Sequence, residues 1–416
     1  MVSLFYFCPM KHLVIIGTVL PEPNSTAAGS RMMQLIRFFL SENYKITFLC
    51  AALPTDYSAN LGSIGVQTKT VKLNDSSFEE LIYELNPDTV LFDRFTTEEQ
   101  FGWKVAEVVP QAVRILDTED LHFLRKGREE AFKQGVECSL SHLTNDIFKR
   151  EMASILRCDL SLIISEFEMD LLTSTFKIQP ELLHYLPLFA ENSVESPGFE
   201  HRRHFISIGN FLHEPNWQTV LGIKKIWKEI RRQIHDAEVH IYGAYVPQKA
   251  MQLHNVKEGF LVKGRASDVS EVFNKARVLL APIPFGAGIK GKLLHAMSLG
   301  LPNVTSSIGA EAIPGFLPWS GYIADEEADF IEKAAHLYKE SAAWDTARNN
   351  GFRIINERFS KDLFLPDFSS KLVHISENLS ELRAKNFMGQ ILQHHQFQST
   401  KYMGKWIEEK NREPFN

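Results

Sequence analysis

The fold of this chain can be read from PIPFGAGIKGKLLHAMSLGLPNVTSSIGAEAI, residues 282–313. The segment opens on the end of an apolar, strand-like run, and LLHAMSLG has the pattern of an amphipathic helix. Between them lies a turn that contains three glycines, Gly286, Gly288 and Gly291. A strand, a glycine-rich turn and a helix N-terminus point backbone amides at an anion, and the helix dipole adds to the attraction. The segment therefore predicts a phosphate-binding turn.

Lys290 and Lys292 add positive charge to this turn, although the chain as a whole is negative. Its 45 Lys and Arg residues face 51 Asp and Glu residues, a net charge of −6. Nucleic acid is not an expected partner, because binding its phosphates depends on positive charge. Any bound anion must be met by a local site. The alternative is that the glycines only turn the chain and that both lysines are solvated.

Upstream of the turn, apolar runs alternate with helical stretches. The runs are FISIGNF (205–211), EVHIYGA (238–244), FLVKG (260–264) and RVLLAPI (277–283). This alternation is typical of parallel strands joined by crossover helices. The chain is expected to be helical again from about Glu326 to Arg358. Residues 205–366 are therefore predicted to form a Rossmann-like C-terminal domain.

A first series of the same kind precedes it, in residues 10–190. Its strand-like runs are 13–19, 45–52, 66–73, 89–95, 113–120 and 160–165. The segment AENSVESPGFEHRRH between the two series is polar and contains proline and glycine, so residues 191–204 are predicted to be a linker. The fold class is thus α/β, with two doubly wound domains that face each other across a cleft.

The two ends of the chain do not follow this pattern. Residues 1–9, MVSLFYFCP, are interpreted as an N-terminal extension that touches a membrane surface at most weakly. Residues 367–416 are predicted to be a helical tail, and their aromatic and basic residues favour contact with a membrane or a partner. The alternative is a helix that packs back across both domains. No apolar run approaches the ~20 residues of a membrane-spanning helix, and the four cysteines lack zinc-site or disulfide spacing, so a cytosolic location is predicted.

Polar side chains follow the strand at 113–117, where ligands bind in open α/β sheets. The segment DTEDLH contains Asp117, Glu119, Asp120 and His122, which can orient hydroxyl groups or accept a proton. Two alternatives are metal coordination by the same cluster and pairing with the following Arg125 and Lys126. The earlier loop PEPNSTAAGSR (21–31) lacks GxGxxG, which disfavours a dinucleotide cofactor.

The segment 282–313 resembles the donor-binding region of the group 1 (family 4) glycosyltransferases, retaining enzymes of the GT-B fold. The similarity is to the subgroup whose motif reads GaGiKgK, then GlPvVtT and iGaEG. GAGIKGK (286–292), AMSLGLPNVTSS (296–307) and IGAEAI (308–313) match it nearly position by position. IGNFLHEPN (208–216) and ILDTEDLHFLR (115–125) fit the same subgroup. The resemblance covers most of residues 13–360 and is more specific in the second domain.

The resemblance implies that a UDP- or GDP-sugar lies on the C-terminal domain, with its diphosphate near GAGIKGK. The donor-binding residues that it implies are Gly209, Asn210, Arg265, Gly286, Gly288, Lys290, Lys292, His295 and Glu311. A glycan or lipid-linked acceptor would dock on the N-terminal half, next to a loop that contains Gly29, Ser30 and Arg31. Transfer with retention then needs no protein nucleophile, metal or further cofactor, because the leaving phosphate helps to deprotonate the acceptor. The catalytic groups would be Asp120, His122 and Lys290, with Lys290 stabilising the departing diphosphate.

The sequence departs from the family at two places. Ala287 and His295 occupy the positions of two glutamates separated by seven residues, the second of which binds the donor ribose. An imidazole can still hydrogen-bond a ribose diol, and Glu311 is an alternative partner. The start of the second domain offers Asn210 and His213 where relatives have a cation, and the substitutes would be Lys263 and Arg265.

These features predict a cytosolic or membrane-peripheral retaining glycosyltransferase. Two other functions stay open. One is a GT-B nucleotide-sugar epimerase. The other is a catalytically silent GT-B protein that binds a nucleotide-sugar or a partner, which the departures at Ala287 and His295 would favour.

Overall fold

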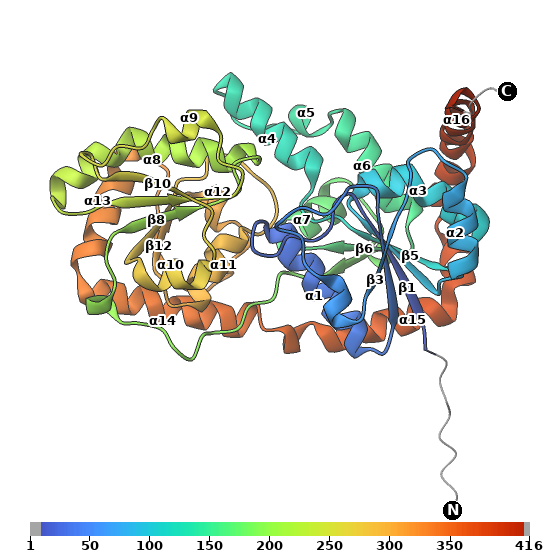
Figure 1. The fold of residues 1–416 in the computed structure, drawn as a ribbon, viewed down its shortest axis with the longest axis horizontal. Helices are drawn as coiled ribbons and strands as arrows, with labels where there is room; N and C mark the ends of the chain where they lie inside the picture. The colour runs from blue at the N-terminus through green and yellow to red at the C-terminus, as the bar shows by residue number, and fades with distance from the viewer. Residues whose placement is uncertain (1–9, 412–416) are drawn as a thin grey trace, which may run out of the picture.

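The computed structural model describes residues 10–411, except for the side chains of residues 395–400 and 411. The predicted N-terminal extension, residues 1–9, lies outside the described residues. Two parallel sheets, each surrounded by helices, stand next to each other along the molecule (Figure 1). The predicted fold class is confirmed: this is the GT-B arrangement of two Rossmann-like domains, with a helical region at the C-terminal end.

The sheet of the N-terminal domain is parallel throughout. Its strands are β1 (His12–Gly17), β2 (Lys45–Cys50), β3 (Gln67–Thr70), β4 (Thr89–Asp93), β5 (Val113–Asp117), β6 (Leu160–Ile163) and β7 (Leu183–Tyr185). They lie in the order β3-β2-β1-β4-β5-β6-β7. Along β1, Val14 and Ile16 belong to one hydrophobic core, whereas Leu13 and Ile15 belong to another. Both faces of the sheet are therefore covered, as in doubly wound proteins.

Helices follow the strands of this domain. They are α1 (Ala27–Ser41), α2 (Ser77–Leu85), α3 (Phe95–Val108), α4 (His122–Gln134), α5 (Leu140–Leu143), α6 (Asp146–Arg157) and α7 (Glu166–Asp170). Short 3₁₀ turns lie at Leu61–Ile64 and Pro180–Leu182, and a π-helical turn at Leu171–Thr175. Because α1, α3 and α4 are the elements that follow β1, β4 and β5, their N-termini lie toward the carboxyl edge of the sheet.

The C-terminal domain repeats this plan. Its strands are β8 (Phe205–Ile208), β9 (Val239–Tyr242), β10 (Phe260–Gly264), β11 (Val278–Ala281), β12 (Asn303–Thr305) and β13 (Gly321–Ile323). They form a parallel sheet in the order β10-β9-β8-β11-β12-β13. Its helices are α8 (Glu214–Gln233), α9 (Gln248–Met251), α10 (Val269–Lys275), α11 (Gly291–Ser298), α12 (Ser307–Ala310), α13 (Glu327–Lys339) and α14 (Ser341–Arg358). The expected single helix over 326–358 is thus two helices, because Glu340 leaves the helical region at φ −95°, ψ 100°.

The segment between the two sheets is fixed to the C-terminal domain. It contains a 3₁₀ turn at Phe199–His201. The fully buried Arg202 donates hydrogen bonds to the carbonyl oxygens of Phe273 (2.6 Å) and Leu299 (2.6 Å). Burial lowers the pKa of its guanidinium to about 10. The predicted linker therefore packs as part of the C-terminal domain, while the residue limits proposed for the domains stay predictions.

The C-terminal helices return to the N-terminal domain. After a 3₁₀ turn at Lys361–Leu363, the chain forms α15 (Leu365–Lys385) and α16 (Phe387–Asn411). Figure 1 shows α15 running along the lower side of the N-terminal domain and α16 standing at the far edge of that domain. Phe368, Leu372 and Ile375 of α15 are buried in the N-terminal core. The start predicted for the tail, residue 367, thus falls inside a helix that completes a core.

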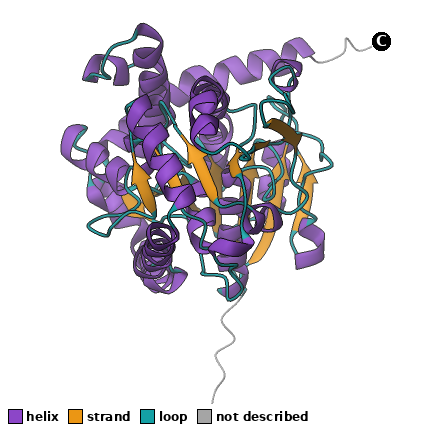
Figure 2. Cartoon of the chain, turned by 90° about the vertical axis from the view of Figure 1, so that its left-hand side faces the viewer, coloured by secondary structure: helices purple, strands orange, loops and turns teal. Residues whose placement is uncertain are grey.

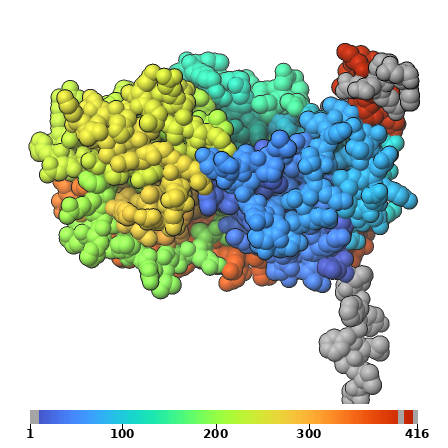
Figure 3. Space-filling model, in the orientation of Figure 1, coloured from blue at the N-terminus to red at the C-terminus, as the bar shows by residue number. Residues whose placement is uncertain are grey.

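The domains touch on the face of the molecule drawn in Figure 3, where the blue N-terminal residues lie against the yellow C-terminal ones. Seen from the C-terminal domain, helices cover the strands on several sides (Figure 2). Within residues 10–411, none of the helices combines the length and the apolar character needed to cross a membrane.

Candidate functional site

A cavity of about 810 Å³ lies between the two domains. Its N-terminal wall comes from α1 and from the ends of β4 and β5, and includes Ser30, Arg31, Arg94, Glu119, Asp120, His122 and Arg125. Its C-terminal wall includes Gly209, Asn210, His213, Asn216, Arg265, Gly286, Lys290, Lys292 and His295. The cavity therefore lies at the carboxyl ends of strands from both sheets, where open α/β sheets bind ligands.

The glycine turn that precedes α11 fits closely against the N-terminal domain. Gly288 has φ +61°, and a Cβ atom there would lie 2.9 Å from the Asp120 Cβ atom. Its N–H donates to Glu168 Oε1 at 2.9 Å, and Arg128 donates to the Gly286 carbonyl oxygen at 2.8 Å. Glycine is thus required at 288 both for the backbone conformation and for the close approach of the domains.

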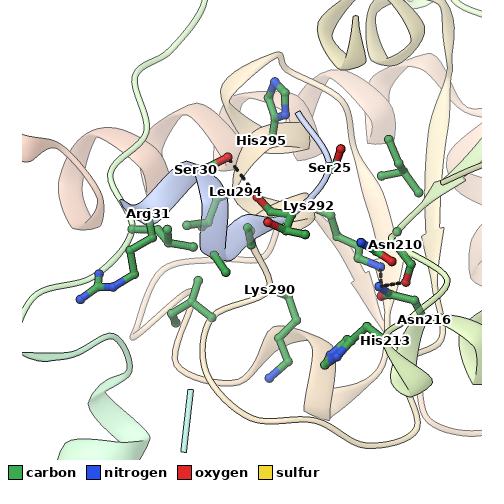
Figure 4. Close-up of a pocket in the computed structure, with 18 of the residues that line it drawn as sticks. Ser25, Ser30, Arg31, Asn210, His213, Asn216, Lys290, Lys292, Leu294 and His295 are labelled. Carbon is green, nitrogen blue, oxygen red and sulfur yellow. Dashed lines mark hydrogen bonds between the residues drawn. The ribbon is translucent and has the colours of Figure 1, made fainter. Parts of the chain in front are cut away.

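Lys290 and Lys292 leave this turn in different directions (Figure 4). Lys290 Nζ donates to the Gly288 carbonyl oxygen at 2.8 Å, and Lys292 Nζ donates to Asn216 Oδ1 at 2.7 Å. Burial lowers the pKa of each ammonium group to about 8. Neither has a carboxylate within 4.0 Å among the described residues. Removing a cation from water is costly unless a negative charge lies close to it, so the buried Lys290 and the partly buried Lys292 both favour an anion at the N-terminus of α11.

His295 lies one helical turn further along α11 and lines the cavity, as its predicted ribose role requires. Its Nε2 lies 3.3 Å from Ser270 Oγ, and its ring lies 5.3 Å from that of Phe273. Burial lowers the pKa of the imidazole, so the ring is neutral near pH 7. A neutral imidazole can exchange a hydrogen bond with a hydroxyl group.

Glu311 and Gly288 do not line the cavity. Both oxygens of the Glu311 carboxylate accept hydrogen bonds from Arg128 of α4, at 2.9 and 2.7 Å. The ribose role considered for Glu311 is therefore not supported by its position, because this carboxylate already joins the two domains.

On the N-terminal wall, Asp120 and His122 lie at the start of α4. Asp120 accepts hydrogen bonds from Arg125 at 2.8 and 3.2 Å. Burial alone would raise the pKa of the Asp120 carboxyl, but Arg125 and His122 hold it well below its usual range. His122 Nδ1 lies 3.2 Å from Glu151 Oε1, which fixes the ring. The pair thus offers an ionised carboxylate and an oriented imidazole to the cavity.

The loop before α1 has a largely structural role. Arg31 is buried, and its Nε donates to Asp117 Oδ1 at 2.8 Å and its Nη1 to the Leu186 carbonyl oxygen at 2.7 Å. Ser30 Oγ donates to the Pro23 carbonyl oxygen at 2.8 Å. Gly29 does not line the cavity, and a Cβ atom there would lie 2.4 Å from the Glu22 backbone. Arg31 was predicted to contact a phosphate or an acceptor. In the structure its guanidinium is already hydrogen-bonded to Asp117, at the end of β5.

The loops after β8 and β10 complete the C-terminal wall. Asn216 Nδ2 donates to the Asn210 carbonyl oxygen at 2.9 Å, and a Cβ atom at Gly209 would lie 2.5 Å from the Asn216 side chain. The guanidinium carbon of Arg265 lies 4.3 Å from the centre of the Tyr57 ring, which belongs to the N-terminal domain. Burial lowers the pKa of His213 to about 4, so this imidazole stays neutral.

Several residues of the site were absent from the sequence-based prediction. Asn216 is the last residue of IGNFLHEPN, a segment that the sequence analysis had singled out, so the sequence could have indicated it. Arg128 and Glu168 gave no local signal, because their partners lie across the domain interface. Among residues 10–411, no group of three or more His, Cys, Asp and Glu side chains is arranged to hold a metal ion.

Comparison with known proteins agrees with this geometry. Residues 202–340 match the family model described as glycosyl transferases group 1. No curated protein sequence matches the chain. The matched residues include the glycine turn and α11 of the C-terminal domain.

Solved structures share the fold over most of the chain. Sucrose-phosphate synthase from Thermosynechococcus elongatus is 11% identical, with a TM-score of 0.65 over 88% of this chain and 99% of its own. HepE from Anabaena, solved with UDP and glucose, is 13% identical, with a TM-score of 0.63 over 88% and 100%. WaaG, a glycosyltransferase involved in lipopolysaccharide biosynthesis, is 13% identical, with a TM-score of 0.60 over 86% and 99%. These structures show that the chain shares the GT-B fold, and the family match falls within its C-terminal part.

Proposed function

We propose that this protein is a retaining, metal-independent glycosyltransferase of family 4 that transfers a sugar from a UDP- or GDP-sugar to a hydroxyl group of a glycan or lipid-linked acceptor. The observation that carries the proposal is a pair of lysines at the N-terminus of α11, inside the cavity between the domains: Lys290 is buried and Lys292 is partly buried. A diphosphate would supply the negative charge that these ammonium groups lack.

The same geometry gives the residues their roles in transfer. Negative charge grows on the diphosphate as the bond to the sugar breaks, and a preorganised cation in a closed cavity stabilises that charge. Lys290 and the first N–H groups of α11 would provide this stabilisation. Asp120 and His122 would orient the acceptor hydroxyl from the opposite wall, while the leaving phosphate helps to accept its proton.

UDP is the nucleotide to test first. HepE binds UDP and glucose in its solved complex, and the pneumococcal O-GlcNAc transferase GtfA binds UDP and GlcNAc in its own. His295 would contact the ribose from the cavity side of α11. A cytosolic location with peripheral membrane contact is also part of the proposal.

The test combines binding with turnover. We expect one class among UDP-, GDP- and ADP-sugars to raise the melting temperature, and to donate its sugar in the presence of EDTA. Proton NMR of the product should show the anomeric configuration of the donor. Inversion would contradict the retaining mechanism, and binding without transfer would favour the catalytically silent alternative. Isomerised nucleotide-sugar in place of a glycoside would favour the epimerase.

A further inference from the structure

Two residues on the N-terminal wall of the cavity have backbones that side chains rarely allow. Arg94 has φ +71° and ψ 160°, a combination essentially restricted to glycine, and Glu119 has φ +63°. They follow β4 and β5, which are neighbours in the sheet. The Arg94 N–H donates to the Asp117 carbonyl oxygen at 2.8 Å, which ties the two positions together. Such strain persists where the surrounding fold holds it, and it gathers at ligand sites.

The side chains at these two positions have unused hydrogen-bonding capacity. Glu119 is 9% exposed and lines the cavity, and its buried Oε1 has no hydrogen-bond partner within the part of the chain that the structure describes. Arg94 also lines the cavity, and the hydrogen bond of its Nη1 goes to Thr18 Oγ1 at 3.3 Å. Its Nε lies 3.8 Å from Asp93 Oδ1, too far for a hydrogen bond. A buried polar atom without a partner normally marks a place that a ligand or water fills.

The charges around Glu119 indicate what it can bind. Burial raises the pKa of its carboxyl to about 8; Arg94 and Arg31 oppose the rise, while Asp117 and Asp93 add to it. The neighbouring Asp120 is instead held ionised by Arg125. A carboxyl that keeps its proton both donates and accepts a hydrogen bond, as a hydroxyl group does. Its natural partner is therefore a neutral hydroxyl group.

We propose that Arg94 and Glu119 form the acceptor subsite and bind hydroxyl groups of a neutral carbohydrate on the wall opposite the glycine turn. This inference rests on the function proposed above. The Glu119 carboxyl would exchange hydrogen bonds with one hydroxyl group, and the free N–H groups of Arg94 would donate to a second oxygen. An anionic acceptor is disfavoured, because Asp93, Asp117 and Asp120 surround Arg94.

The test is steady-state kinetics of the full chain. The donor is the nucleotide-sugar that the wild type transfers, and the acceptors are the methyl glycosides of glucose, galactose, mannose and N-acetylglucosamine. We expect Glu119→Ala to raise the acceptor KM about tenfold and to leave the donor KM within twofold. Glu119→Gln should stay within threefold of the wild type, since an amide also donates and accepts. The matched control is Glu130→Ala on α4, outside the cavity.

Arg94→Gly separates a binding role from a structural one. Glycine adopts φ +71° without strain, so we expect an unchanged or higher melting temperature together with an acceptor KM about tenfold higher. A lower melting temperature with donor and acceptor KM raised alike would overturn the inference. An unchanged acceptor KM in both Glu119→Ala and Arg94→Gly would also overturn the inference, while the proposed function would stand.

The behaviour of the wild type separates this inference from the proposed function. If the wild type transfers no sugar to any of these glycosides, hydrolyses no donor and binds no UDP, GDP or ADP, the proposed function fails and this inference fails with it. If the wild type turns over a donor but uses none of the four glycosides, a neutral carbohydrate subsite is overturned alone.

Discussion

At the scale of single residues, burial sets the chemistry of the site. Lys290 and Lys292 line the cavity, and Asp120 is a carboxylate that Arg125 and His122 keep ionised. Partial or full burial reduces the screening of these charges by water, so each interacts more strongly with a ligand that carries or develops charge than it would on the surface. The effect of substituting them should therefore appear in binding and turnover more than in folding.

Lys290→Ala tests this view directly. Loss of one preorganised cation typically costs ~3 kcal/mol of transition-state stabilisation, about a hundredfold in turnover. The melting temperature should change little, because removing a buried charge offsets the lost packing. Kinetics and thermal unfolding of Lys290→Ala, with the surface variant Lys126→Ala as control, measure both effects. Wild-type turnover would show that Lys290 does not contact the diphosphate.

His295 provides the second residue-scale prediction. If it binds the ribose, His295→Ala should weaken nucleotide binding about fivefold, or ~1 kcal/mol for one hydrogen bond. His295→Glu should keep or strengthen binding, because a carboxylate also accepts from a diol. Calorimetry with UDP and GDP on the three proteins decides between these outcomes. Equal affinities of the three proteins would mean that His295 does not bind the ribose and contacts only protein groups such as Ser270 and Phe273.

At the scale of elements, α15 shows how a polar segment can hold a core together. Its polar residues predicted a tail, yet Phe368 is fully buried against Phe38 and His184. The alternative considered for the tail was a helix packed across both domains, whereas the contacts of α15 lie with the N-terminal domain. A helix that continues from one domain and completes the core of the other limits how freely the domains separate.

Phe368→Ala should therefore destabilise the N-terminal domain. Removal of a fully buried phenylalanine typically costs ~3–5 kcal/mol. Urea unfolding followed by tryptophan fluorescence measures the change, and the exposed Val373→Ala on the same helix should shift stability by less than ~0.5 kcal/mol. Equal effects of the two substitutions would mean that α15 contributes little to the core.

At the scale of the whole molecule, buried and partly buried side chains join the two domains around the cavity. Glu168 accepts hydrogen bonds from the Leu121 N–H of one domain and the Gly288 N–H of the other. Arg128 pairs with Glu311, and the Tyr245 hydroxyl donates to Glu22 at 3.0 Å. The cavity exists because these contacts bring two independently formed sheet edges together.

Glu168 makes this interface sensitive to pH. Burial and the nearby Asp120 raise the pKa of its carboxyl to about 8, above the ordinary value of 4.5. Between these two values the native state binds more protons than the unfolded state, so stability falls as pH rises, by up to about 1.4 kcal/mol per pH unit. Glu168→Gln keeps the acceptor oxygen and removes this dependence.

Melting temperatures of the wild type and of Glu168→Gln, measured from pH 5 to pH 8, test the prediction. The wild-type curve should fall more steeply over this range than that of the variant. The exposed Glu166→Gln should follow the wild type. Parallel curves for the wild type and Glu168→Gln would show that this carboxyl is ionised throughout.

The sequence by itself determined the class of fold and the position of the glycine turn before α11. Both are local properties: the period of apolar residues separates strands from helices, and glycines allow the backbone that a tight turn needs. The segments around Gly288, Asp120 and Asn210 were therefore found without coordinates, and they do line or border one cavity.

Only the tertiary structure decided the partners of these groups. Arg128 and Glu311 are 183 residues apart, and Glu168 and Gly288 are 120 residues apart, so no local pattern connects them. Arg31 turned out to hold Asp117, and Glu119 turned out to have a buried carboxyl oxygen with no hydrogen-bond partner among the described residues. A charged residue has the same sequence signature whether it is solvated, paired or free to bind. Its burial and its neighbours, which set its pKa and its unused hydrogen bonds, arise only when distant segments pack together.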